Sequence, residues 1–161
     1  MAHTHSYRTT ISWTGETRDY NSYSREYNVA IPGKPKFKAS ADPAFKGDPR
    51  LYTPEDMLLV SLATCHMLSY LAVCARIGVT VLAYEDDAEA TMAIKAQPGE
   101  KIGRMRFTDV LLRPKVTLAP GADFAKAEAA HARAHDECFI ANSVNFPVRH
   151  EATIVQAGKA A

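Results

Sequence analysis

Residues 53–78 read T-P-E-D-M-L-L-V-S-L-A-T-C-H-M-L-S-Y-L-A-V-C-A-R-I-G and predict one long helix with both ends marked. Thr53 is a suitable N-cap because its hydroxyl can accept from the free amides of the first turn, and Pro54 suits the first helical position. Gly78 supplies the left-handed residue that commonly ends a helix. Between these ends the apolar side chains point in every direction, so we expect this helix to be buried on all sides.

The whole chain has the composition of one globular domain. Its 161 residues are 47% hydrophobic and 23% charged, which is enough for a sizeable core. The net charge is +1, so nothing electrostatic calls for nucleic acid or an anionic membrane. The segment 53–78 has charged ends and too much Ser, Thr and His for a convincing membrane span, and residues 1–7 lack the apolar core of a signal peptide. We therefore expect a single domain over residues 1–161, located in the cytoplasm.

Alternation and turn residues predict the remaining elements. A second helix is expected over residues 123–137, where small apolar side chains recur at steps of three and four. Extended segments are expected at residues 7–14, 27–31, 36–39, 79–94, 106–118 and 148–155. This order indicates an α+β fold in which a curved antiparallel sheet wraps the long buried helix.

One sheet and one amphipathic helix can hardly cover a helix that is apolar on every side. A second copy of the chain could cover the remainder. We therefore expect an intimate homodimer with a large apolar interface.

The chain has three cysteines, in no zinc-like pairing, which we expect to be buried or redox-active thiols rather than structural disulfides. Cys74 follows Cys65 by nine positions on the same helix, on the opposite face and about 13 Å further along, so these two cannot be bridged. Cys138 is the one intrachain partner left for Cys65. A nucleophilic and a resolving cysteine are then geometrically possible, although both could also be small buried hydrophobes.

A reactive Cys65 needs a cation beside it, because a thiol on an apolar helix has a raised pKa and is inert. His66 is next in sequence, but its side chain points about 100° away. Arginine is the better candidate because it stays charged when buried. The candidates are Arg18 and Arg25 in the polar N-terminal hairpin and Arg50 in the loop before the helix.

Glu55 could be the carboxylate that aims such an arginine. The alternative is a residue that only complements the helix dipole, worth a few tenths of a kcal/mol or so. Ten residues separate Glu55 from Cys65, roughly 15 Å along the axis. Glu55 would therefore act through a long arginine, or at the site of the other subunit, and either role fits a site at a dimer interface.

Together these motifs resemble the OsmC/Ohr family, the osmotically inducible and organic hydroperoxide resistance proteins. Residues 53–67, T-P-E-D-M-L-L-V-S-L-A-T-C-H-M, are similar to the family pattern N-P-E-E-L-L-x-A-A-x-A-x-C. Cys138 is followed by F-I-A-N-S at residues 139–143, and the order of elements over residues 7–155 extends the resemblance to nearly the whole chain.

The resemblance implies a thiol peroxidase that acts on organic hydroperoxides, and an intertwined homodimer with two sites at the subunit interface. Cys65 would be the peroxidatic cysteine and Cys138 the resolving cysteine. Glu55 matches the glutamate that orients an arginine against the thiolate. The chemistry needs no metal, haem or flavin, and a thiol or dithiol would reopen the disulfide.

The arginine is where this sequence departs from the family. One branch carries it just ahead of F-x-G in the loop before the helix, where this chain has Pro43 and Ala44 ahead of F-K-G. The other branch carries it just after the first strand, which corresponds to Arg18. Arg25, which opens the second strand, is the candidate that we favour over Arg18.

Two other interpretations stay open. In the first, the dimer is a binding module that holds a lipid-like molecule in an apolar interfacial pocket, with the cysteines as packing or as a slow redox sensor. In the second, His131 and His135, spaced as helical metal ligands can be, form a metal site with Cys138. That motif lacks a clear further ligand, so we expect a satisfied or solvent-facing histidine pair instead.

Overall fold

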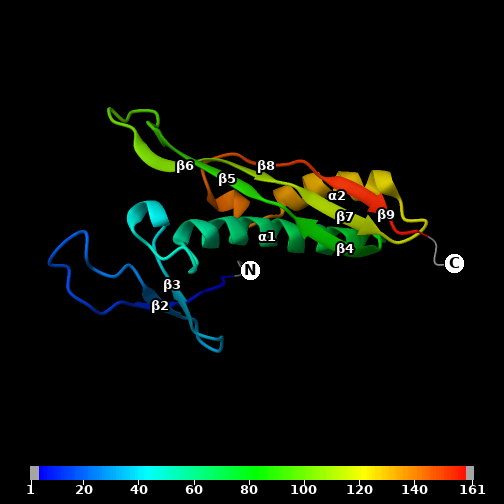
Figure 1. The fold of residues 1–161 in the computed structure, drawn as a ribbon. Helices are drawn as coiled ribbons and strands as arrows, with labels where there is room; N and C mark the ends of the chain where they lie inside the picture. Colours follow the sequence, from blue (N-terminus) through cyan, green and yellow to red (C-terminus); the bar gives the residue numbers. More distant parts are fainter. Residues whose placement is uncertain (1–3, 159–161) are drawn as a thin grey trace. The chain divides into compact units, whose positions relative to one another are not determined.

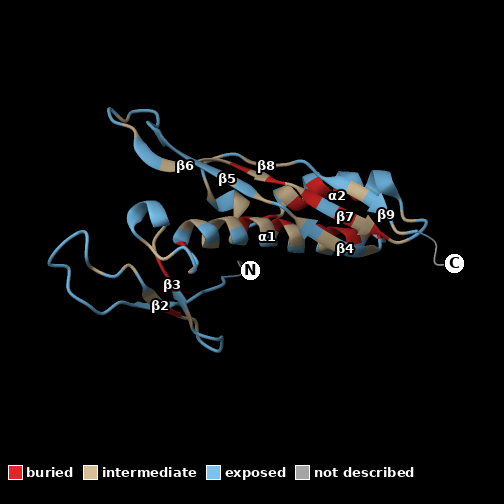
Figure 2. Cartoon of the chain, in the orientation of Figure 1, coloured by how far each residue is buried: buried red, intermediate tan, exposed pale blue. Residues whose placement is uncertain are grey.

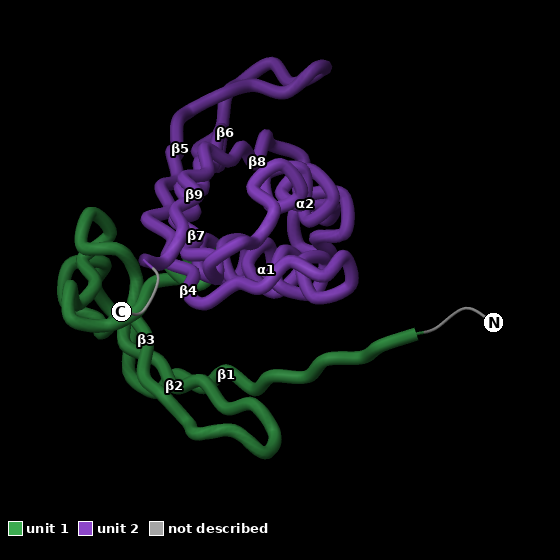
Figure 3. Tube along the Cα trace, turned by 90° about the vertical axis from the view of Figure 1, so that its right-hand side faces the viewer, with its two compact units in different colours: residues 1–58 green, residues 59–161 purple. Residues whose placement is uncertain are grey.

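The structure is a computed structural model that describes residues 4–158. The chain divides into two compact units, Met1–Leu58 and Leu59–Ala161, which Figure 3 draws in different colours. Each unit has its own strands. The single domain expected over residues 1–161 stays a prediction.

The first unit contains a three-stranded antiparallel meander. Its strands are β1 (Thr10–Ser12), β2 (Tyr27–Ala30) and β3 (Phe37–Ala39), paired in the order β1-β2-β3. They lie within the three predicted segments and are shorter than predicted. Gly33 adopts a φ of +76° in the turn between β2 and β3, which explains the glycine there. The following loop holds the short 3₁₀ helix η1 (Pro43–Phe45), which Asp42 caps.

Helix α1 (Pro54–Ile77) begins and ends as the sequence predicts. The Asp56 amide donates to Thr53 Oγ1 at 3.1 Å, and the Thr53 amide donates to the Asp56 carboxylate at 2.9 Å. This reciprocal capping satisfies two amides that the helix itself leaves free. At the other end Gly78 has a φ of +74°, the left-handed conformation that ends the helix.

The second unit contains two three-stranded sheets, in the orders β4-β7-β9 and β5-β6-β8 (Figure 1). The strands are β4 (Val81–Asp86), β5 (Glu89–Lys95), β6 (Arg104–Leu112), β7 (Pro114–Leu118), β8 (Val148–His150) and β9 (Thr153–Gln156). Strands β4 and β7, and β5 and β6, pair antiparallel as expected. Strands β8 and β9 run parallel to β6 and β7, so the predicted all-antiparallel pairing is wrong for the last segment. The chain returns to the sheet through a helix, and such a crossover makes parallel neighbours.

Each of the last three predicted extended segments is broken in two, and the three breaks lie at one level. They separate β4 from β5, β6 from β7, and β8 from β9. The Asp86 carboxylate accepts from the Arg113 amide at 2.7 Å, and the Glu151 amide donates to the Leu112 carbonyl at 2.9 Å. Backbone groups at the break are thus satisfied without continuous ladders.

Helix α2 (Phe124–Asp136) packs through its alanines in the core of the second unit. Asp123 caps it by accepting from the Lys126 amide at 3.0 Å. Ala127, Ala130 and Ala134 are at most 1% exposed, and small side chains of this kind permit close approach. The Tyr70 hydroxyl on α1 donates to the Ala127 carbonyl at 3.2 Å and so joins the two helices.

Only one stripe of α1 is buried in this chain (Figure 2). Its buried residues are Leu62, His66, Tyr70, Val73 and Cys74. Val60 and Leu68 are about 60% exposed (59% and 61%), so the expectation of burial on all sides is not met within one chain. The helix is long and apolar enough to cross a membrane, but the core helix of a soluble protein passes the same test. The homodimer that would cover the exposed stripe stays a prediction.

Candidate functional site

The structure brings together the two cysteines that the sequence singles out. Cys65 lies half-buried on α1, and Cys138 follows the end of α2 and is 1% exposed. The Cys138 thiol lies close enough to Cys65 for Cys65 to affect its pKa. Burial raises the pKa of Cys138 to about 11, and the neighbouring Cys65 adds to this. Cys138 is therefore a neutral thiol at neutral pH, and neither cysteine is in a disulfide.

Local backbone structure holds Cys138 in this position. Its amide donates to the His135 carbonyl at 3.1 Å, which continues the last turn of α2. Its own carbonyl accepts from the Asn142 amide at 3.0 Å. The next turn is the 3₁₀ helix η2 (Ala141–Ser143), and the Ser143 hydroxyl donates to the Phe139 carbonyl at 2.7 Å. The polar residues that follow Cys138 therefore fix the turn that presents it.

Cys74, in contrast, lies in the apolar core. It is 1% exposed, and burial raises the pKa of its thiol. Its neighbours there include Tyr70, Val73 and Val116. Cys74 is a packing residue of the core.

Glu55 lies in the first turn of α1 with one carboxylate oxygen buried. That atom, Oε2, has no hydrogen-bond partner among the described residues. Burial raises the pKa of the Tyr27 hydroxyl on β2, and the negative charge of Glu55 contributes to the same shift. A buried carboxylate oxygen without a hydrogen-bond donor is unfavourable. A cationic side chain that donated to Glu55 Oε2 would therefore be stabilised here.

Arg25 is held within its own loop. Its guanidinium donates to the carbonyls of Tyr20 and Tyr23 and lies 3.5 Å from the centre of the Tyr23 ring. Within residues 4–158, no hydrogen bond or ion pair joins Arg25 to Glu55. The predicted Arg25–Glu55 pair therefore stays a prediction.

The other two arginine candidates also have local partners. Arg18 pairs with Glu16 at 2.8 Å, and both side chains are exposed. Arg50 pairs with Asp48 at 2.6 Å. These ion pairs leave the role of either arginine at the thiols a prediction.

The sequence did not reveal a cluster of histidines in the core of the second unit. His66 on α1 and His131 on α2 are 1% and 2% exposed, and His66 Nε2 lies 3.1 Å from His131 Nδ1. His150 on β8 stacks on both rings, with centroids 5.3 and 5.5 Å away. His131 also stacks on Tyr70 at 4.0 Å. One sequence signal was available: His66 lies four residues from both Leu62 and Tyr70, on one helical stripe.

These histidines are neutral at neutral pH. Burial, together with a smaller effect of the neighbouring imidazoles, lowers the pKa of His66 to about 4 and of His131 to about 3. Burial also lowers the pKa of His150. A neutral imidazole has one donor and one acceptor nitrogen, so His66 and His131 share a single N–H···N hydrogen bond.

No metal site is formed by this cluster in the part of the chain that is described. Residues 4–158 contain no group of three or more His, Cys, Asp or Glu side chains placed to hold a metal ion. The set of His131, His135 and Cys138 considered from the sequence is therefore not assembled as ligands. In addition, His131 Nδ1 is already engaged by His66.

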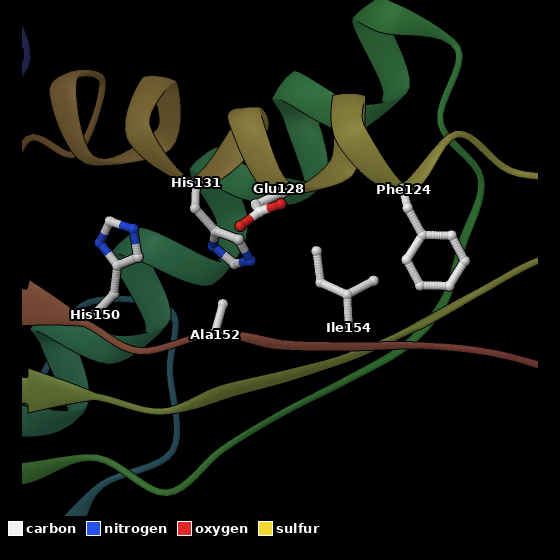
Figure 4. Close-up of a pocket in the computed structure, with 6 residues that line it drawn as sticks. All are labelled: Phe124, Glu128, His131, His150, Ala152 and Ile154. Atoms are coloured by element: carbon white, nitrogen blue, oxygen red, sulfur yellow. The ribbon is translucent and has the colours of Figure 1, made fainter.

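A cavity of about 390 Å³ opens beside the histidine cluster (Figure 4). Its lining residues come from α2 and from the end of the chain: Phe124, Glu128, His131, His150, Ala152 and Ile154. None of the predicted catalytic residues lines it, whereas His131, one of the candidate metal ligands, does. A second cavity, of about 410 Å³, runs along the exposed stripe of α1 and includes Leu59, Val60 and Met67.

Comparison with known proteins identifies the class to which this fold and thiol pair belong. Residues 47–153 match the family model described as OsmC-like protein, so the chain belongs to the OsmC-like family. No curated protein matches. An OsmC-like protein of unknown function from Vibrio cholerae is 28% identical, with a TM-score of 0.83 over 93% of this chain and 100% of that chain.

Two organic hydroperoxide resistance proteins share the fold at lower identity. The protein from Elizabethkingia anophelis is 15% identical, with a TM-score of 0.70 over 98% of this chain and 100% of that chain. The protein from Bacillus subtilis is 14% identical, with a TM-score of 0.61 over 92% of this chain and 98% of that chain. The predicted family and α+β fold class are thereby confirmed.

Proposed function

We propose that this chain is a cysteine-dependent thiol peroxidase that reduces organic hydroperoxides. The observation that carries the proposal is that the half-buried Cys65 lies close enough to the buried Cys138 to raise the pKa of its thiol. Family membership, and the names of the two hydroperoxide resistance proteins that share the fold, support it.

Two displacement steps would make up the oxidative half of the cycle. The Cys65 thiolate attacks the distal peroxide oxygen, the O–O bond breaks, the alcohol leaves, and Cys65 becomes a sulfenic acid. Cys138 then attacks that sulfur, a disulfide forms, and the hydroxyl leaves as water with the proton of the Cys138 thiol. A thiol or dithiol reductant donates two electrons and reopens the disulfide.

The environments of the two thiols suit these two roles. Cys65 is partly accessible, so a peroxide can reach it. Cys138 is buried with a raised pKa, so it stays protonated and out of contact with peroxide until the sulfenic acid forms beside it. The opposite assignment would require the less accessible thiol, whose pKa is raised by burial, to react first.

Activation of Cys65 is proposed to use Arg25 and Glu55. Arg25 now donates to two neutral carbonyls, whereas Glu55 offers a buried carboxylate oxygen that lacks a donor. Hydrogen bonds between charged groups are roughly twice as strong as neutral ones, so an exchange of partners would be favourable. We also propose that the protein is a homodimer, in which the second chain would cover Val60 and Leu68. We propose that it is located in the cytoplasm, where thiol reductants are present.

The test is intact-mass analysis with peptide mapping before and after one equivalent of cumene hydroperoxide. A loss of two hydrogens that maps to Cys65 and Cys138 supports the cycle. Cys65→Ser should abolish peroxide consumption, whereas Cys74→Ser, the matched control in the core of the same helix, should retain it. Three intact thiols after treatment, or turnover by Cys65→Ser, would refute the proposal.

The second candidate is a module that binds a hydrophobic small molecule without turnover. The observation that favours it is the cavity of about 410 Å³ along α1, whose lining includes Leu59, Val60, Ala63 and Met67. Most small-molecule sites are concave and mainly apolar, and this volume lies in their usual range of about 300–1,000 Å³. A co-purified ligand in native mass spectra, together with no disulfide after peroxide treatment, would favour this function.

A further inference from the structure

His131 presents a buried nitrogen for which the described residues supply no partner. Its Nδ1 is engaged with His66, but its Nε2 has no hydrogen bond. In Figure 4 one ring nitrogen of His131 points toward the Ile154 side of the cavity of about 390 Å³. Buried polar groups in folded proteins are normally hydrogen-bonded, so an orphaned nitrogen beside a cavity indicates a missing ligand.

The charge of the cavity lining selects the kind of ligand. Glu128, one turn before His131 on α2, is the one charged side chain among the six lining residues, and Figure 4 draws its carboxylate beside the His131 ring. His131 and His150 are neutral at neutral pH because burial lowers the pKa of each. An anion would therefore meet one negative charge and no positive charge, whereas a cation would meet a carboxylate and two neutral imidazoles.

The remaining lining residues of the cavity are apolar. Phe124 at the start of α2 and Ile154 on β9 lie beyond the polar side chains at one end of the cavity, and Ala152 lies below His131 (Figure 4). An aromatic ring and a branched aliphatic side chain can cover an apolar body and also attract a nearby cation to the ring face. The volume is in the range that small organic ligands occupy.

We propose that this cavity is a binding site for a small organic ammonium ion whose apolar body rests against Phe124 and Ile154. The ammonium group donates to His131 Nε2 and to the Glu128 carboxylate. This site is separate from the thiol chemistry, because neither Cys65 nor Cys138 lines it.

Binding fixes the position of one proton in the histidine pair. A neutral imidazole has one N–H, so a His131 Nε2 that accepts from the ligand must have its hydrogen on Nδ1. That hydrogen then points at His66 Nε2, 3.1 Å away, which must be the acceptor. The ligand-bound tautomer of His131 is thus a spectroscopic signature that a surface-bound amine would not produce.

The test is a titration of the full-length protein with benzylamine at neutral pH, followed by two-bond ¹H–¹⁵N spectra of the histidine side chains. We expect saturable binding at millimolar concentrations that leaves His131 Nε2 unprotonated and Nδ1 protonated. Benzoate, of matched shape and opposite charge, should not bind. Glu128→Gln should weaken benzylamine binding about tenfold, whereas Asp136→Asn, which removes an exposed carboxylate on the same helix, should not.

Three results would overturn the proposal. Benzoate could bind as well as benzylamine, Glu128→Gln could leave the affinity unchanged, or the His131 signals could stay constant to saturation. Zinc sulfate is tested in parallel, and saturable zinc binding that shifts the same nitrogens and excludes benzylamine would assign the cavity to a metal instead.

Discussion

Acid should destabilise this protein through the buried pair of His66 and His131. Both rings are at most 2% exposed and are surrounded by aromatic side chains, including His150 and Tyr70. The neighbouring imidazoles oppose protonation of the pair, and the exposed Glu128 carboxylate beside His131 does not offset the effect of burial on its pKa. A proton added to either ring would place an unpaired positive charge in the core.

The magnitude follows from the two protonation equilibria. In the unfolded chain a histidine binds a proton with a pKa of about 6.5, whereas His66 in the folded chain has a pKa of about 4. Between these values the unfolded chain binds more protons, so the free energy of unfolding falls as pH falls from about 6.5 to about 4. The difference corresponds to about 3 kcal/mol for one proton on the pair. We count one proton because the charge of His66 itself lowers the pKa of His131.

Urea unfolding at about pH 7 and about pH 4.5 measures this effect. Most of the loss, about 2 kcal/mol, should be present at the lower pH, and Tm should fall by roughly 6 °C for a chain of this size. The double variant His66→Leu/His131→Phe keeps the volumes apolar and should lose much less between the two pH values. His5→Gln, which removes an exposed histidine outside this cluster, should behave as the unmodified protein.

The carboxylates with shifted pKa values do not account for a loss of stability in this range of pH. Hydrogen bonds from Arg50 lower the pKa of Asp48 to about 2, so its contribution is lost only at more acidic pH. Burial raises the pKa of Asp86, which would stabilise the fold as pH falls. The same loss in the double variant and in the unmodified protein would show that the buried histidines do not cause the acid sensitivity.

Three further predictions concern the thiols, the end of α1 and its exposed stripe. Cys138→Ser should leave the sulfenic acid unresolved, so mass spectra after excess peroxide should show the gain of two oxygens that marks a sulfinic acid; a stable sulfenic acid would contradict the resolving role. Gly78→Ala should lower the free energy of unfolding by about 1 kcal/mol in urea titrations, because Gly78 has a φ of +74°. The control Gly158→Ala should change the free energy of unfolding little, because φ is not positive there and no atom of residues 4–158 lies near the added methyl group. Leu68→Lys should convert the proposed dimer to monomers in sedimentation analysis, because it places a charge on an exposed apolar stripe; an unchanged mass would remove Leu68 from the interface.

Local signals predicted the parts of the fold that depend on neighbours in sequence. Thr53 and Gly78 bound α1 because capping and left-handed geometry involve only residues within one turn. The alanine stripe of α2 was visible for the same reason. In contrast, the breaks in the strands depend on pairing across the sheet, such as that of Asp86 with Arg113, and sequence periodicity does not report such pairs.

In the candidate site, too, local sequence signals predicted some features and missed others. Cys65 and Cys138 were found by elimination, because helix geometry excludes a bridge to Cys74. The position of His66 on a stripe with Leu62 and Tyr70 indicates burial, but its contact with His131 joins residues 65 positions apart and has no local signal. The local partners of Arg25 depend on the fold of a long loop, which composition alone does not define.

The shared break across the sheet of the second unit has a consequence for changes in chain length. Because β4, β7 and β9 pair separately from β5, β6 and β8, each half of the sheet has its own register. Residues inserted in the turn of the β5–β6 hairpin need not reverse the inward and outward side chains of Val116 and Leu118, which belong to the core. The hairpin can therefore lengthen, shorten or change its surface during evolution while the packing of β7 on the helices is conserved.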